Sequence, residues 1–130
     1  MSTKDNHTKN TLLETMKANW KTYVAAWNAT DNCEREKLLA QAAVDDSCYI
    51  DPNVELKGHE ALAEYMAKFH QQVPNSRFVL TRFIAHHCKS IADWDVQDKD
   101  GNTLFTGLSY GTYNAQGQLT AEHGFFEITE

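Results

Sequence analysis

The sequence predicts an α+β domain, because helical and strand periodicities occupy different parts of the chain. Up to about Gln72, most apolar residues recur every three or four positions, which is the spacing of amphipathic helices. From Arg77 onward they alternate with polar residues at every second position, and glycine-containing turns separate the runs. Helices followed by a meander of strands are typical of helices packed on one face of a curved antiparallel sheet.

The composition indicates one folded domain in a reducing compartment. The chain has 130 residues, 42% of them hydrophobic, and a net charge of −6. The basic residues are scattered, which argues against a nucleic-acid partner, since phosphate binding needs a basic stripe. There is no apolar run of membrane-spanning length and no signal-peptide core, so we expect no membrane association and a cytoplasmic location. The three cysteines form no C-x-x-C pair and fit reduced thiols.

The first half of the chain is expected to contain three helices. Residues 1–9 are polar and are predicted to be a disordered tail before a single domain over 10–130. A long helix runs from Thr11 to the Asn28-Ala29-Thr30 break. Its apolar face is formed by Leu13, Met16, Trp20, Tyr23, Val24 and Trp27.

The next elements follow from capping and turn signals. Asp31 with Glu34 resembles a capping box and begins a second helix. Val44 to Ile50 reads as a short strand, which Pro52 ends because it has no N–H to donate. A third helix covers about Gly58 to Gln72, before the breaker Pro74-Asn75. Four strands follow, over 77–87, 91–96, 103–113 and 118–128.

One strand carries a signal for a cavity. Gly107, Ser109 and Gly111 fall on the same face of their strand. Glycines in a strand mark a bend or a close approach of another group. If this face looks inward, the wall is hollow there, which suggests a cavity between sheet and helices.

The order of these elements, with their residues, resembles the superfamily of nuclear transport factor 2 (NTF2-like), which includes the SnoaL-like polyketide cyclases and the ketosteroid isomerases. The landmarks are Tyr23 to Asp31, Tyr49-Ile50-Asp51-Pro52 with Gly58, and Gly117 to Phe126. The resemblance implies a cystatin-like cone, in which three N-terminal helices pack on a strongly curved antiparallel sheet around an apolar pocket. It also implies a homodimer through the outer face of the sheet, for which Phe83, Leu108, Tyr110 and Phe125 are candidates.

The resemblance to ketosteroid isomerase assigns two catalytic candidates. Asp51 matches the carboxylate that moves a proton between carbons, and Tyr23 matches the tyrosine that donates to the enolate oxygen. The second oxyanion donor of that enzyme falls at Ser109, whose hydroxyl is a weaker donor. The supporting tyrosine of the third helix falls near Met66. These departures argue against steroid isomerisation itself.

The remaining candidates would bind a ligand. Trp20, Trp27, Trp94 and Phe126 could line an apolar pocket, with core packing as the alternative, especially for Trp20. Glu122 shares the inward face of its strand with Gly124 and Phe126, where an acidic residue is unusual. The alternative for Glu122 is a rim position, where its carboxylate reaches water.

No cofactor or metal is expected. The sequence contains no nucleophile elbow, phosphate-binding glycine loop or dinucleotide fingerprint. His86 and His87 are adjacent on a predicted strand, so they should point to opposite faces and should not share an ion.

Two functional hypotheses follow. The first is a SnoaL-like pocket protein for a small apolar molecule, acting without a cofactor as an isomerase or cyclase by proton transfer on a carbonyl compound, with Asp51 as base and Tyr23 with Ser109 as polar anchors. The second is a non-catalytic ligand-binding or protein-interaction domain. A buried, unpaired Asp51 beside Tyr23 would favour the enzyme, whereas an Asp51 held by backbone N–H groups would favour the binding domain.

Overall fold

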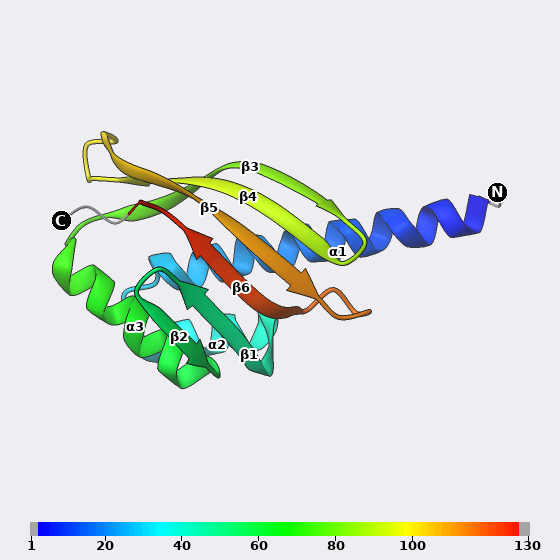
Figure 1. The fold of residues 1–130 in the computed structure, drawn as a ribbon, viewed down its shortest axis with the longest axis horizontal. Helices are drawn as coiled ribbons and strands as arrows, with labels where there is room; N and C mark the ends of the chain where they lie inside the picture. The colour runs from blue at the N-terminus through cyan, green and yellow to red at the C-terminus, as the bar shows by residue number, and fades with distance from the viewer. Residues whose placement is uncertain (1–2, 128–130) are drawn as a thin grey trace.

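The computed structural model describes residues 3–127, with side chains from residue 10 onward, and confirms the α+β class (Figure 1). The helices are α1 (Thr3–Asn28), α2 (Asn32–Ala42) and α3 (His59–Gln72). The strands are β1 (Ala43–Asp51), β2 (Val54–Lys57), β3 (Arg77–His86), β4 (Lys89–Gln97), β5 (Thr103–Tyr113) and β6 (Leu119–Phe125).

The strands form one six-stranded sheet in the order β2-β1-β6-β5-β4-β3. Neighbouring strands are antiparallel except β1 and β6, which pair in parallel, so the sheet is mixed rather than wholly antiparallel as expected. A parallel pair needs a long crossover, and here α3 and β3 to β5 supply it. The short strand β2 was missed, because Pro52 was read as the end of the extended segment.

Local signals explain where the helices begin. The side chain of Asp31 accepts a hydrogen bond from the backbone N–H of Glu34 (2.9 Å) at the start of α2, as the capping pattern predicted. Gly58 precedes α3 with a φ of 89°, a conformation that favours glycine. Helix α1 begins at Thr3, earlier than expected. Residues 3–9 of the expected tail belong to this helix, and residues 1–2 lie outside the described residues.

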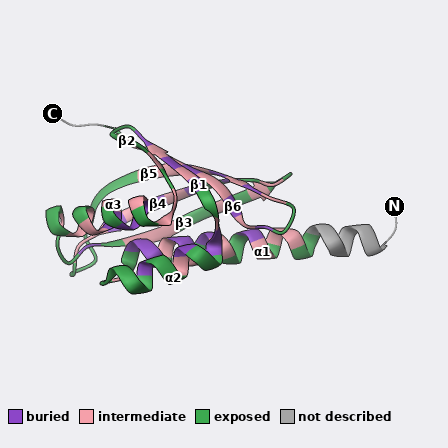
Figure 2. Ribbon diagram, turned by 90° about the horizontal axis from the view of Figure 1, so that it is seen from below, coloured by how far each residue is buried: buried purple, intermediate pink, exposed green. Residues whose placement is uncertain are grey.

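The core lies between the sheet and the helices (Figure 2). Its buried side chains come from α1, α2, α3 and the inner sheet face, and the largest that are fully buried are Met16, Trp20, Leu39, Leu62, Met66, Leu119, Glu122 and Val96. Burial of these apolar groups is the main favourable contribution to folding. Glu122 is the exception in that set.

A β-bulge reverses the expected faces of β3. The register with β4 passes from Leu80↔Trp94 to Arg82↔Asp93, which leaves Thr81 unpaired. Phe83 therefore points inward, where its ring lies 6.5 Å from that of Trp20. The prediction that Phe83 lies on the outer face was wrong, because one extra residue exchanges the two faces of a strand.

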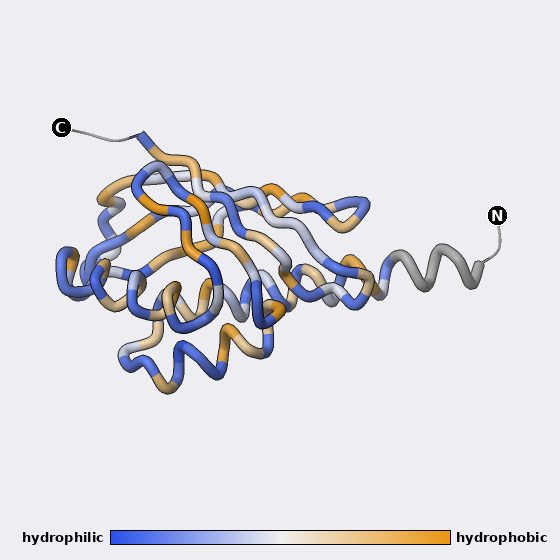
Figure 3. Tube along the Cα trace, turned by 60° about the horizontal axis from the view of Figure 1, so that its bottom comes forward, coloured by the Kyte–Doolittle hydropathy of each residue, from blue (hydrophilic) through white to orange (hydrophobic). Residues whose placement is uncertain are grey.

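None of the helices in the described part of the chain is long and apolar enough to cross a membrane. Figure 3 shows apolar and hydrophilic residues mixed along the chain trace.

Candidate functional site

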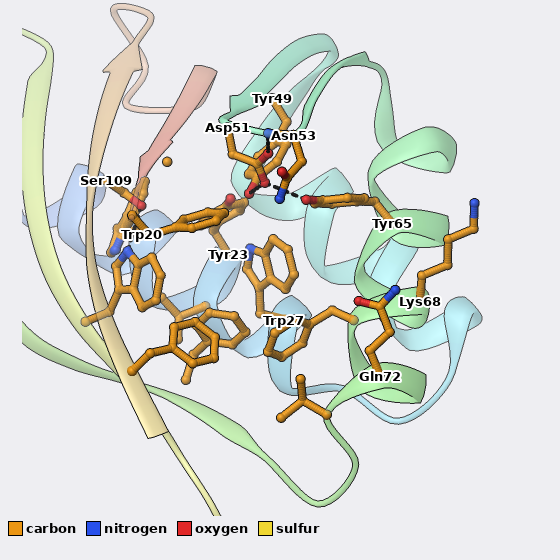
Figure 4. Close-up of a pocket in the computed structure, with 18 residues that line it drawn as sticks. Trp20, Tyr23, Trp27, Tyr49, Asp51, Asn53, Tyr65, Lys68, Gln72 and Ser109 are labelled. Carbon is orange, nitrogen blue, oxygen red and sulfur yellow. Dashed lines mark hydrogen bonds between the residues drawn. The ribbon is translucent and has the colours of Figure 1, made fainter. Parts of the chain in front are cut away.

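A cavity of about 330 Å³ lies between the helices and the inner face of the sheet (Figure 4). Predicted site residues on its wall come from α1, β1, β4, β5 and the segment after β6: Trp20, Tyr23, Trp27, Asp51, Trp94, Ser109 and Phe126. The other lining residues are Val24, Tyr49, Asn53, Tyr65, Lys68, Phe69, Gln72, Val73, Phe78, Phe105 and Gly124. Glu122 is not among the residues that line it.

Aromatic rings form most of the wall. The ring of Trp27 lies 4.9 Å from Phe78 and 5.9 Å from both Phe69 and Tyr49. The ring of Trp94 lies 5.3 Å from that of Phe78, which joins the two indoles through one phenyl ring. An aromatic wall of this kind suits a small, flat, apolar molecule, because contact with it removes apolar area from water.

The glycines of β5 admit indole rings instead of leaving empty space. A Cβ at Gly107 would lie 2.2 Å from Cζ2 of Trp94, and a Cβ at Gly111 would lie 3.2 Å from Cζ3 of Trp20. The glycine pattern correctly indicated a close approach. However, the rings of Trp94 and Trp20 fill the space beside Gly107 and Gly111, and the same rings form part of the cavity wall.

Asp51 is buried and accepts hydrogen bonds at both carboxylate oxygens. Its Oδ1 accepts from the backbone N–H groups of Asn53 (2.8 Å) and Val54 (3.1 Å). Its Oδ2 accepts from the hydroxyls of Tyr49 and Tyr65, each at 2.7 Å. These four hydrogen bonds hold the carboxylate in one orientation.

Tyr49 and Tyr65 line the cavity beside Asp51, and the sequence did not single them out as site residues. Tyr49 lies two residues before Asp51 in a strand, so both side chains point to the same face. Burial, followed by the hydrogen bond to Asp51, raises the pKa of Tyr65 to about 12. Burial and the neighbouring Tyr23 and Asp51 also raise the pKa of Tyr49. Both phenols therefore keep their protons at neutral pH and act as donors.

Two further hydroxyls reach the cavity. The Oγ of Ser109 accepts from the indole N–H of Trp94 (3.0 Å), which leaves its own proton available for donation. Tyr23 is buried on α1, and burial, followed by the charge of Glu122, raises its pKa well above the usual value. Both polar anchors proposed from the sequence therefore lie on the wall, and both can donate to an acceptor.

Glu122 lies behind this wall rather than on a rim. It is 1% exposed, and neither carboxylate oxygen has a hydrogen-bond partner among the described residues. Burial raises the pKa of Glu122 to about 8.

The hairpin between β3 and β4 differs from the sequence prediction. His87 leaves the strand with a φ of 48°, and its Nδ1 lies 3.0 Å from Nδ1 of His86. The expectation that these rings point to opposite faces was wrong, because it assumed continuous strand geometry. Among the described residues, no group of three or more histidines, cysteines and acidic residues is arranged to hold a metal ion.

The comparisons with known proteins agree with this fold. The family model described as the SnoaL-like domain matches residues 20–122. A SnoaL-like family protein from Agrobacterium tumefaciens, named as a candidate isomerase, is 28% identical, with a TM-score of 0.80 over 88% of this chain and 99% of that chain. No match was found among functionally curated proteins.

More distant structures share the fold alone. A candidate SnoaL-like polyketide cyclase from Jannaschia is 15% identical, with a TM-score of 0.68 over 90% of this chain and 85% of that chain. An NTF2-like protein of unknown function from Cytophaga hutchinsonii is 14% identical, with a TM-score of 0.64 over 86% of this chain and 89% of that chain. The family model covers most of the domain, and the chain therefore belongs to the SnoaL-like domain family.

Proposed function

We propose that this protein binds a small, mainly apolar carbonyl compound in its aromatic cavity. The observation that carries the proposal is an enclosed wall of aromatic rings with two hydroxyl donors, Tyr23 and Ser109. Aromatic faces provide apolar contact, and a carbonyl oxygen would accept from the hydroxyls that have protons to donate.

The state of Asp51 favours binding over turnover. A carboxylate that already accepts from two phenols and two backbone N–H groups has few free lone pairs with which to take a proton. Its bonds hold Tyr49 and Tyr65 in fixed positions on the wall. Asp51 thus supports an ordered pocket, as the hypothesis of a binding domain requires.

A fluorescent ketone tests the binding proposal. Prodan is a neutral aromatic ketone whose emission shifts to the blue in apolar surroundings. We expect saturable binding with a blue shift, and we expect Ser109→Ala to weaken it about fivefold to tenfold through loss of one hydrogen bond. Absence of saturable binding would refute the proposal for this class of ligand.

Two adjacent phenylalanines provide a matched control. Phe126 lines the cavity, whereas Phe125 is 57% exposed. Phe126→Ala should weaken prodan binding and Phe125→Ala should not. Equal effects of the two substitutions would place the probe outside the cavity.

The second candidate function is cofactor-free proton transfer on the same class of compound. Two observations support it: Asp51 lies on the cavity wall, and the relative from Agrobacterium tumefaciens is named as a candidate isomerase. Such an activity would require Asp51 to release one phenol when the substrate binds, and Tyr23 with Ser109 would stabilise the enolate oxygen.

Deuterium uptake distinguishes the two candidates. A β,γ-unsaturated ketone is incubated in D₂O with the protein, and exchange at its α-carbon is followed by NMR. Catalysed exchange that Asp51→Asn abolishes would support an enzyme. Saturable binding of the same ketone with exchange no faster than in buffer would support a binding protein.

We further propose that the protein forms a homodimer through the outer face of the sheet. Ile84 and Ile91 are cross-strand neighbours, and Ile91 pairs in turn with Tyr110. Ile84 is 47% exposed, Ile91 49% and Phe125 57%. A second copy would cover this apolar surface.

A cytoplasmic location stays part of the proposal, supported by the free thiols of Cys33, Cys48 and Cys88.

A further inference from the structure

A second cavity, of about 250 Å³, lies where the segment between α1 and α2 meets the segment between α3 and β3. Its wall includes Thr30 from the first segment, Asn75 from the second, Arg35 of α2 and His70 of α3. None of the residues that line it also lines the aromatic cavity, and none of them is acidic. Arg35 and His70 therefore give this cavity a wall with basic groups and no carboxylate.

Arg35 is buried and is held in one position. The residue is only 3% exposed, which is rare for an arginine. Its Nη1 donates to Oδ1 of Asn32 (2.7 Å), and its Nη2 donates to the backbone carbonyl of Ala29 (2.6 Å). These two hydrogen bonds fix the guanidinium between the first turn of α2 and the segment that follows α1.

The charge of Arg35 is not neutralised within the described part of the chain. Arg35 takes part in no ion pair there, and its Nε has no hydrogen-bond partner. Asn32 and Ala29 occupy two of the five N–H donors of the guanidinium, and both are neutral acceptors. Buried charges are normally paired, because removing an ion from water is costly. An anion bound in the cavity would supply the missing negative charge.

His70 places a second nitrogen base on the same wall. Its Nε2 donates to the backbone carbonyl of Trp27, so the proton of the neutral ring lies on Nε2. The other ring nitrogen, Nδ1, becomes a donor when the imidazole is protonated. The ring also takes part in no ion pair among the described residues. The wall thus combines a fixed guanidinium with an imidazole that can add a second positive charge.

We propose that this second cavity binds a small oxyanion, a phosphate or carboxylate group, through the guanidinium of Arg35 with His70 beside it. A planar guanidinium presents its N–H groups as a fork that matches the oxygens of either group. The site is separate from the proposed ketone site, because the two cavities share no lining residue. The alternative is that Arg35 only ties α2 to the segment after α1, through Asn32 and Ala29.

The arginine side chains allow a direct NMR test. The chain has three arginines, and Arg77 and Arg82 are exposed on β3, so their Nε–H signals are internal controls for that of Arg35. Sodium phosphate or sodium acetate is titrated into ¹⁵N-labelled wild type at constant ionic strength and mildly acidic pH. The Arg35 signal should shift saturably with at least one of the two, and the tighter anion identifies the preferred group. No saturable shift with either, or equal shifts of all three arginines, would overturn the proposal.

Thermal unfolding with the same anions tests the role of the guanidinium, since an anion bound to the folded state raises the unfolding temperature. Arg35→Gln should abolish this stabilisation, and Arg82→Gln, at an exposed site, should keep it. Arg35→Lys keeps the charge but loses the fork, so it should weaken binding roughly tenfold. Equal stabilisation of wild type and Arg35→Gln would overturn the proposal. If Arg35→Gln does not fold, Arg35→Lys and the wild-type spectra decide.

Discussion

Two buried carboxyl groups occur within one small core, and their partners differ completely. Asp51 accepts from four donors, whereas Glu122 has no partner among the described residues. Donors aimed at a carboxylate stabilise the anion, and burial without donors stabilises the neutral acid. Burial without donors therefore raises the pKa of Glu122, whereas four donors fix the orientation of the Asp51 carboxylate on the cavity wall.

Glu122→Gln should remove a pH dependence of folding. The pKa of Glu122 is raised from 4.5 to about 8 in the folded protein, so between these values the folded state binds more protons than the unfolded state. Wild-type stability should therefore fall as pH rises from about 5 to 8, by roughly 3–5 kcal/mol. Urea unfolding at several pH values checks this, and a parallel decline in Glu122→Gln would contradict it.

Asp51→Asn should destabilise the protein by about 2–4 kcal/mol, since an amide NH₂ faces donors that previously met a carboxylate oxygen. Loss of the anion leaves Tyr49 or Tyr65 without a good acceptor. Asp46→Asn, on the exposed part of the same strand, is the control and should change stability little. Chemical denaturation gives the free energy of unfolding of both variants. If Asp51→Asn were as stable as Asp46→Asn, the hydrogen bonds of Asp51 would make no net contribution to stability.

At the level of secondary structure, the close packing of β5 against Trp94 predicts that a larger side chain at Gly107 destabilises the protein. Gly107→Ala would place a methyl group 2.2 Å from the Trp94 ring. We expect a loss of about 1–3 kcal/mol from overpacking, together with a displaced indole visible in the near-ultraviolet circular dichroism. Thr106→Ala on the exposed face is the matched control. A stable variant with an unchanged aromatic spectrum would contradict the packing described here.

The sequence predicted the helices and most of the strands, but it did not predict which strands pair with each other. The helices, the turns and the Asp31 cap were recognisable because periodicity and capping are local properties. The parallel pairing of β1 with β6 was not, since it joins segments about seventy residues apart. The bulge at Thr81 adds one residue to a run that otherwise alternates regularly, and no local pattern marks it.

The candidate site was predictable to a similar extent. The tryptophans were chosen as aromatic residues that could line an apolar pocket, and Tyr23, Asp51 and Ser109 were chosen because they match positions of the ketosteroid isomerases; all of them line the cavity. Tyr49 and Tyr65 were not singled out, since periodicity identifies the inward face of an element but does not show which groups a hydroxyl on that face contacts. The position of Glu122 behind the wall depends on the register between strands and on the ring of Trp20, which only the folded chain determines.

At the scale of the whole molecule, one substitution tests the proposed homodimer. Ile91→Asp would place a charge in the middle of the exposed apolar row between Ile84 and Tyr110. We expect wild type to have the mass of a dimer and the variant that of a monomer in size-exclusion chromatography with light scattering, because burying an unpaired charge is unfavourable. A wild-type monomer at micromolar concentration would refute the proposed assembly.

The central position of β6 has a consequence for synthesis of the protein. This strand, the last of the strands that the structure describes, lies between β1 and β5 and joins the two halves of the sheet. A nascent chain without residues 119–125 exposes two further strand edges, those of β1 and β5, in addition to the outer edges at β2 and β3. The two halves of the sheet therefore cannot join until residues 119–125 are available, and chains truncated before them should be the form most prone to aggregation.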